Sequence, residues 1–146
     1  STFEFLEELA ANNARGWFEE HKPGYERDVR EPALAFIRGF SPRLKKISPF
    51  FVASDRRVGG SLMRVYRDTR FAKDKTPYNT HLHMLWRETG RADGPAWFFG
   101  VSLDYVRAGW GWFGWTSAQI STWRAAIDGP YGPAIDAGRE TVSSGS

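Results

Sequence analysis

The sequence predicts an α+β protein in which N-terminal helices pack on an antiparallel sheet of about four strands, followed by a C-terminal helix. Three observations support this order. Apolar residues recur at helical spacing through the first third of the chain, up to Ile47. The next half alternates apolar and polar residues and is rich in aromatic and branched side chains, with Gly or Pro between most segments. Helical spacing then returns after Ser117.

The N-terminal part divides into three predicted helical pieces. A first helix, capped by Thr2 or Ser1, is expected to end near Asn12-Asn13. A short second helix covers residues 15–22, where Pro23-Gly24 is expected to interrupt the chain. The third, amphipathic helix spans 25–47; it is entered or interrupted at Pro32 and strained near Pro42.

The sheet and the C-terminal helix follow. Ser117 is the predicted cap of the C-terminal helix, and Gly129-Pro130 is its predicted end. The small, polar tail at 141–146 is expected to fray. No long linker divides the chain, so the sequence predicts a single domain over residues 1–146. The four predicted strands are Leu62–Arg67, His81–Arg87, Trp97–Leu103 and Tyr105–Trp115.

Composition narrows the class of protein. With 41% apolar and 25% charged residues in 146 positions, the chain is typical of a globular domain. The absence of Cys excludes disulfides, thiolate metal sites and a thiol nucleophile, and it fits a reducing compartment. No apolar run approaches the roughly 18 residues of a membrane span. We therefore expect a cytoplasmic protein without a membrane partner.

The segment Arg64 to Tyr78 carries five cations, two carboxylates and three aromatic rings in fifteen positions. Guanidinium groups bind carboxylate or phosphate in a bidentate manner, and Lys adds a mobile positive charge, so converging cations would form an anion site. The segment therefore predicts binding of a phosphorylated or other anionic small ligand. The predicted ligand-binding residues are Arg64, Tyr66, Arg67, Arg70, Lys73, Lys75 and Tyr78.

The same segment could carry chemistry. Asp68 or Asp74 would act as acid or base on a bound ligand, His81 is an alternative base, and the cations would stabilise negative charge in a hydrolytic or transfer reaction. The pattern equally fits a structural network in which the two carboxylates pair with neighbouring cations. The sequence leaves open whether the protein is an enzyme, and it indicates no cofactor.

The run Arg-Val-Tyr-Arg-Asp-Thr-Arg-Phe-Ala-Lys-Asp-Lys-Thr-Pro-Tyr at 64–78 resembles the signature of a family of conserved hypothetical proteins, a domain of unknown function found in bacteria and fungi. The resemblance covers roughly residues 3–128 and extends to an N-terminal pattern that includes Asn12-Asn13 and Trp17-Phe18. It implies a shared site without a named reaction. Family members tend to run longer, so we expect this chain to be shortened at its C-terminus, and the missing segment could complete the site.

Other candidates have structural interpretations beside the functional ones. His81 and His83 would share a strand face, but two ligands are too few for a metal, and no metal site is predicted. The side chains of Asn12 and Asn13 could form hydrogen bonds with a polar ligand, although Asn commonly caps the C-terminus of a helix in a left-handed conformation. Trp110 and Trp112 would share the strand face opposite two glycines and would pack under the helices or stack on ligands.

Two alternative functions remain. The cations together with Trp110, Trp112 or Trp115 could bind single-stranded nucleic acid, which is a weaker prediction than a small anion. Exposed aromatic residues could instead serve a structural or protein-interaction domain. The sequence does not determine the oligomeric state.

Overall fold

The structure, a computed structural model, describes residues 1–90, 94–112 and 114–143, with side chains up to residue 137. Its elements are, in chain order, α1 (Thr2–Ala11), α2 (Arg15–Tyr25), the π-helical turn η1 (Glu26–Arg30), α3 (Glu31–Ile47), β1 (Phe51–Val52), β2 (His81–Glu88), β3 (Pro95–Ser102), β4 (Val106–Trp112), α4 (Ser117–Asp128) and α5 (Gly132–Ser143). They pack as two units, Ser1–Trp112 and Phe113–Ser146. The predicted α+β class, with N-terminal helices, a four-stranded antiparallel sheet and C-terminal helical structure, is confirmed. The expectation of a single domain stays a prediction.

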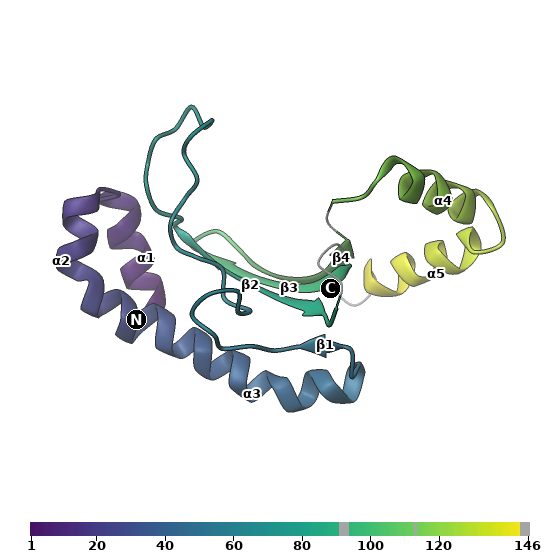
Figure 1. Ribbon diagram of the computed structural model, residues 1–146, viewed down its shortest axis with the longest axis horizontal. Helices are drawn as coiled ribbons and strands as arrows, with labels where there is room; N and C mark the ends of the chain where they lie inside the picture. The colour runs from purple at the N-terminus through teal and green to yellow at the C-terminus, as the bar shows by residue number, and fades with distance from the viewer. Residues whose placement is uncertain (91–93, 113, 144–146) are drawn as a thin grey trace. The chain divides into compact units, whose positions relative to one another are not determined.

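The helices of the first unit form one short and one long run (Figure 1). Ser1 caps α1 in a capping box with Glu4, as one of the two predicted caps. The predicted interruption at Pro23-Gly24 is wrong, because α2 continues through both residues into η1 and α3. Pro32 has no N–H to donate to a helical carbonyl, and the hydroxyl of Thr2 donates to the carbonyl of Asp28, four residues before it, at 2.5 Å. This bond also ties α1 to the long run.

The sheet has the order β1-β2-β3-β4, with every neighbouring pair antiparallel. Three predicted strands correspond to β2, β3 and β4. The predicted strand Tyr105–Trp115 is longer than β4, which ends at Trp112, and Phe113 lies outside the described residues. The predicted strand Leu62–Arg67 is wrong: this segment makes only isolated bridges, Leu62 to Met84 and Tyr66 to Tyr78. The remaining strand of the sheet is β1, which was not predicted because two residues are too few to show an alternating pattern in the sequence.

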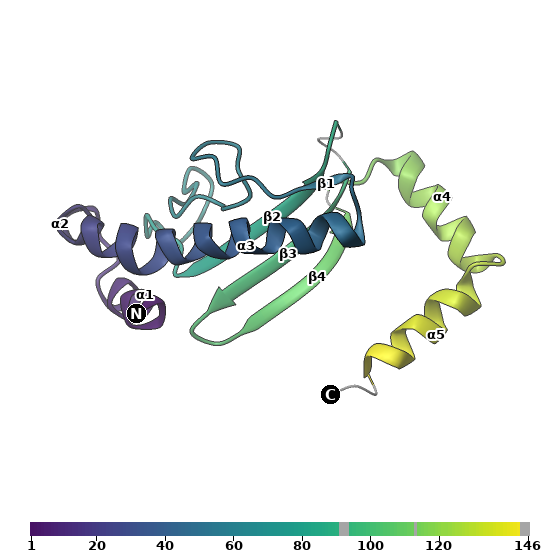
Figure 2. The same cartoon turned by 90° about the horizontal axis from the view of Figure 1, so that it is seen from below.

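The core lies between the long helical run and one face of the sheet (Figure 2). In β2, Leu82, Met84 and Trp86 face the helices, because alternate residues of a strand share a face. Phe40 of α3 packs against Trp86 with ring centroids 5.1 Å apart. The buried helical residues of this core are Phe5, Leu9, Phe18, Tyr25, Val29, Ala33, Leu34, Ile37 and Leu44.

The second unit contains α4 and α5. Thr116, rather than the predicted Ser117, caps α4 in a capping box with Gln119. Helix α5 was not predicted; it includes residues 141–143 of the tail expected to fray, while 144–146 lie outside the described residues. Within the part of the chain that the structure describes, no helix has the length and apolar character needed to cross a membrane.

Candidate functional site

The charged segment forms an arm that projects from the first unit, seen in Figure 1 as the long teal loop before β2. We call residues 67–77 the arm. Its base is the bridge between Tyr66 and Tyr78, where Arg67 N–H donates to the carbonyl of Pro77 at 2.9 Å and Asn79 N–H donates to the carbonyl of Val65 at 2.7 Å. Residues 65–67 and 77–79 thus run side by side, and residues 68–75 form the projecting part.

Ion pairs brace the arm internally. Arg70 binds both carboxylate oxygens of Asp68, at 2.9 and 2.6 Å. Arg67 contacts Asp74 at 2.6 Å and also donates to the hydroxyl of Thr76. The hydrogen bond from Arg67, followed by those from Thr76, lowers the pKa of Asp74 to about 2. Both aspartates are therefore ionised acceptors that are already occupied by arm residues.

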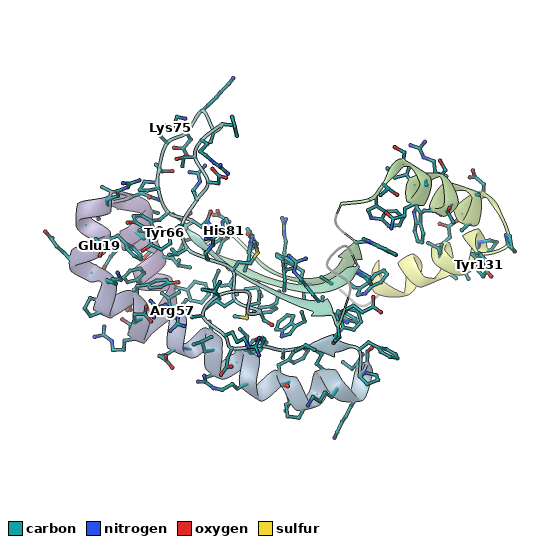
Figure 3. The ribbon with its side chains drawn as sticks, viewed as in Figure 1. Glu19, Arg57, Tyr66, Lys75, His81 and Tyr131 are labelled. Carbon is teal, nitrogen blue, oxygen red and sulfur yellow. The ribbon has the colours of Figure 1, made fainter. Side chains whose placement is uncertain are left out.

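The remaining arm residues lie away from the rest of the unit. The ammonium group of Lys75 donates to the carbonyl of Thr69 at 2.9 Å, so it closes the loop on itself. Phe71 is 96% exposed. Lys73 makes no hydrogen bond or ion pair with the residues that the structure describes. Figure 3 shows Lys75 far out along the arm, well separated from Tyr66 at its base and from Arg57.

The base of the arm is anchored to the helices. The side chain of Asn13, between α1 and α2, donates to the carbonyl of Tyr78 at 2.9 Å and accepts from its N–H at 3.1 Å. The ring of Tyr78 stacks on Phe18 of α2 at a centroid distance of 4.1 Å. Asn13 is therefore structural, as interpreted from the sequence, but neither it nor Asn12 adopts a left-handed conformation.

An open cavity of about 200 Å³ lies beside this base. The helical run forms one wall, and the segment 56–66 forms the other. Five cations and one carboxylate line the cavity, so its formal charge is +4 (five minus one). The lining residues are Phe18, Lys22, Tyr25, Glu26, Arg30, Leu34, Arg56, Arg57, Val58, Leu62, Met63, Arg64, Val65 and Tyr66.

The helical wall is formed where the long run changes from α2 to the π-helical turn η1. Such turns insert an extra residue and occur frequently at functional sites. Glu26 and Arg30 stand at the two ends of η1 and pair at 3.0 Å, and Glu26 also reaches Arg57 across the cavity at 3.6 Å. Glu26 thus holds two of the five cations with one carboxylate.

A closed loop forms the opposite wall. Ser61 N–H donates to the carbonyl of Ser54 at 2.7 Å, and the Ser61 hydroxyl accepts from Ser54 N–H at 3.0 Å. Gly60 is required within it, since a Cβ there would lie 2.2 Å from the carbonyl oxygen of Arg56. This tight closure presents Arg56 and Arg57 to the cavity.

Four polar side-chain groups in the cavity lining, those of Arg56, Arg64, Tyr25 and Tyr66, have no hydrogen-bond or ion-pair partner among the residues that the structure describes. Among the described residues, neither the guanidinium group of Arg56 nor that of Arg64 makes a hydrogen bond or an ion pair. The same holds for the hydroxyl of Tyr25, a residue only 9% exposed. Burial, followed by the negative charge of Glu26, raises the pKa of Tyr25 to about 12, so its hydroxyl remains a hydrogen-bond donor at neutral pH.

The predicted base His81 lies on β2, outside the cavity lining. Its ring stacks on His83 at 3.9 Å, and His83 is hydrogen-bonded to the hydroxyl of Tyr105 at 2.7 Å. Burial lowers the pKa of His81, and the positive charge of Arg67 lowers it further. Within the described residues no group of three or more His, Cys, Asp or Glu side chains is arranged to hold a metal.

The structure therefore divides the predicted site residues. Arg64 and Tyr66 line the cavity, and Tyr78 packs on Phe18 beneath the base. The other predicted binding residues, together with Asp68 and Asp74, belong to the arm and do not line the cavity; they are Arg67, Arg70, Lys73 and Lys75.

Sequence reasoning missed most of the cavity. One signal was available, because two adjacent arginines precede Val58 and two glycines, a composition suited to a tight loop. A second was the spacing of four residues between Glu26 and Arg30. The missed residues are Lys22, Tyr25, Glu26, Arg30, Arg56 and Arg57.

Comparison with known proteins gives a family but no activity. A family model described as "Conserved hypothetical protein (DUF2461)" matches residues 1–135. No significant match is found among curated proteins or among solved structures. The match covers almost the whole chain, including both walls of the cavity and the entire arm. The resemblance drawn from the sequence is thus confirmed, and the chain belongs to this family of conserved hypothetical proteins.

Proposed function

We propose that the protein binds a small anionic ligand, such as a phosphorylated compound, in the cavity between η1 and the segment 56–66. The observation that carries this proposal is the excess of five cations over one carboxylate around a single concavity. Isolated cations on a convex surface are solvated, whereas converging guanidinium groups desolvate and bind an anion together. Arg56 and Arg64 are the principal binding groups, because their donors have no partner among the described residues.

The volume limits the ligand. Sites for drug-sized ligands usually enclose about 300–1,000 Å³. A cavity of about 200 Å³ is smaller than these, so the proposed ligand is the size of a simple monophosphate rather than of a nucleotide. Hydrolytic or transfer chemistry would need an acid or base from the cavity lining, where Glu26 is the carboxylate, since Asp68, Asp74 and His81 lie outside it. The absence of Cys suits a cytoplasmic location, which we also propose.

The test measures binding of inorganic phosphate by calorimetry at low salt. A charge-assisted hydrogen bond contributes about 1.5–3 kcal/mol, so the double variant Arg56→Gln/Arg64→Gln should lose at least about tenfold in affinity. Two controls each remove one cation outside the cavity, Arg43→Gln on α3 and Lys73→Gln on the arm, and are compared with the single variants Arg56→Gln and Arg64→Gln. Both controls should bind phosphate as the native protein does.

Three outcomes separate the alternatives. Equal affinity of the native protein and the double variant, including no binding by either, contradicts the cavity as an anion site. A loss in Lys73→Gln as large as in the double variant would place binding on the arm. Single-stranded DNA that binds with a log–log salt slope near −0.7 per phosphate, and competes with inorganic phosphate, would favour the nucleic-acid alternative.

A further inference from the structure

The lining of the cavity separates into a buried apolar part and an exposed cationic part. Phe18, Leu34 and Tyr25 are 1%, 5% and 9% exposed, and all three belong to the hydrophobic core. Leu62 and Val65 are half-buried and pack against the same core. The apolar floor that a ligand can touch is therefore formed mainly by Leu62 and Val65, while Phe18 and Leu34 lie beneath it and are already covered by protein.

The rim has the opposite character. Arg56 and Arg64 are exposed, and the side chain of Arg57 is 71% exposed. A fully polar ligand, such as free phosphate or a sugar phosphate, would satisfy these arginines but would place hydroxyl groups or water against the apolar floor. Burying polar groups without hydrogen-bond partners is unfavourable, so the floor discriminates against such ligands.

The floor does offer one polar atom. Tyr25 is more than nine-tenths buried, and its hydroxyl has no hydrogen-bond partner among the described residues. Its hydroxyl can therefore supply one donor to an oxygen of a bound molecule. The remaining floor contacts are carbon atoms, which recognise shape and apolar area.

We propose that the ligand is an amphiphilic anion, with a compact apolar body on Leu62 and Val65 and a phosphate or carboxylate head at Arg56, Arg57 and Arg64. The inference rests on the proposed function, since it requires that the cavity bind an anion at all. The volume of about 200 Å³ accommodates a single ring or a short branched chain as the body. A long acyl chain or a nucleotide exceeds it.

Matched probes test the body separately from the head. Calorimetry at constant ionic strength compares inorganic phosphate, glycerol phosphate and phenyl phosphate, and then acetate with benzoate. Burying a ring of this size gains roughly ten- to hundredfold in affinity, so phenyl phosphate should bind at least about tenfold tighter than inorganic phosphate. Glycerol phosphate, whose body is polar, should gain nothing.

Two variants test the contacts with the apolar body and with the anionic head separately. Val65→Thr nearly keeps the side-chain volume but places a hydroxyl against the apolar body, and it should weaken phenyl phosphate several-fold more than it weakens inorganic phosphate. Arg64→Gln removes a head contact and should weaken both ligands by the same factor. The comparison of ligands on the native protein stands even if Val65→Thr does not fold.

The outcomes distinguish the inference from the function on which it rests. If inorganic phosphate binds, and neither phenyl phosphate nor benzoate binds tighter than its small counterpart, the amphiphilic ligand is wrong and the anion site stands. Tighter binding of glycerol phosphate than of phenyl phosphate would also overturn it. If no probe binds, the proposed function fails as well.

Discussion

The two hydrogen bonds between the Asn13 side chain and the backbone of Tyr78 give the sharpest stability prediction, because they connect segments that are 65 residues apart in the sequence. Asn13→Ala removes both hydrogen bonds and leaves the N–H and the carbonyl of Tyr78 without these partners in a partly buried position. Each lost bond costs about 1 kcal/mol, and each unpaired buried group adds to that cost. We expect the free energy of unfolding to fall by about 2–4 kcal/mol.

The neighbouring residue supplies the control. Asn12 has the same side chain, but it is exposed and donates only to the carbonyl of Glu8 at 2.9 Å. Asn12→Ala should cost no more than about 0.5 kcal/mol. Asn13→Asp keeps an acceptor for the N–H of Tyr78 and loses the donor to its carbonyl, so its effect should lie between the two alanine variants.

Urea unfolding followed by tryptophan fluorescence measures these differences directly. For a protein of this size the expected loss in Asn13→Ala corresponds to a fall in Tm of about 6–15 °C. If Asn13→Ala is no less stable than Asn12→Ala, the two hydrogen bonds do not hold the base of the arm, and the reasoning is wrong.

Two further predictions concern titration. Hydrogen bonds from Arg67 and Thr76 lower the pKa of Asp74 from its ordinary 3.8 to about 2. Because folding lowers this pKa, the ionised carboxylate stabilises the folded state above pH 3.8, and this stabilisation is lost as the pH falls through 2. Asp74→Asn should therefore lack this part of the acid dependence of Tm, whereas an unshifted carboxyl titration by NMR would contradict it. Burial raises the pKa of Tyr25 from 10.0 to about 12, so the protonated hydroxyl gives stability that is complete below pH 10 and lost as the pH rises through 12. An alkaline absorbance titration should show one tyrosine that ionises near pH 12 in the native protein and is missing in Tyr25→Phe. If Tyr25→Phe keeps this late ionisation, the assignment to Tyr25 is wrong.

Local patterns made most of the fold predictable. The cap Ser1, one of the two predicted, and the alternation in β2 depend on neighbours in the sequence. The continuation of the helix through Pro23 was not predictable in this way. A proline removes one helical hydrogen bond, but the cost falls when the freed carbonyl can reach water or another donor, and near Pro32 the hydroxyl of Thr2, far earlier in the chain, donates to the carbonyl of Asp28.

The candidate site was less predictable because it joins distant segments. Arg64 and Tyr66, two of the residues predicted to bind a ligand, line the cavity, and their role in binding stays a prediction. The sequence could not show that Arg57 and Glu26 meet there, because their contact depends on the closure of the loop by Ser54 and Ser61 and on its packing beside the π-helical turn. Nor could it show that the two aspartates use their charge on arm residues rather than on a ligand.

The arm's ion pairs do not by themselves fix where the cavity residues lie. Exposed ion pairs contribute about 0–1 kcal/mol each, and those of the arm connect arm residues only to one another. The position of Arg64 and Tyr66 is set at the base of the arm, where Tyr78 stacks on Phe18 and Asn13 is hydrogen-bonded to the backbone of Tyr78. Phe18 also lies beneath the cavity floor, so one aromatic stack supports both the arm and the proposed ligand site. The charged run therefore has two physical roles that the sequence presents as one: its outer residues brace the arm, and its first residues complete a cavity built mainly by other parts of the chain.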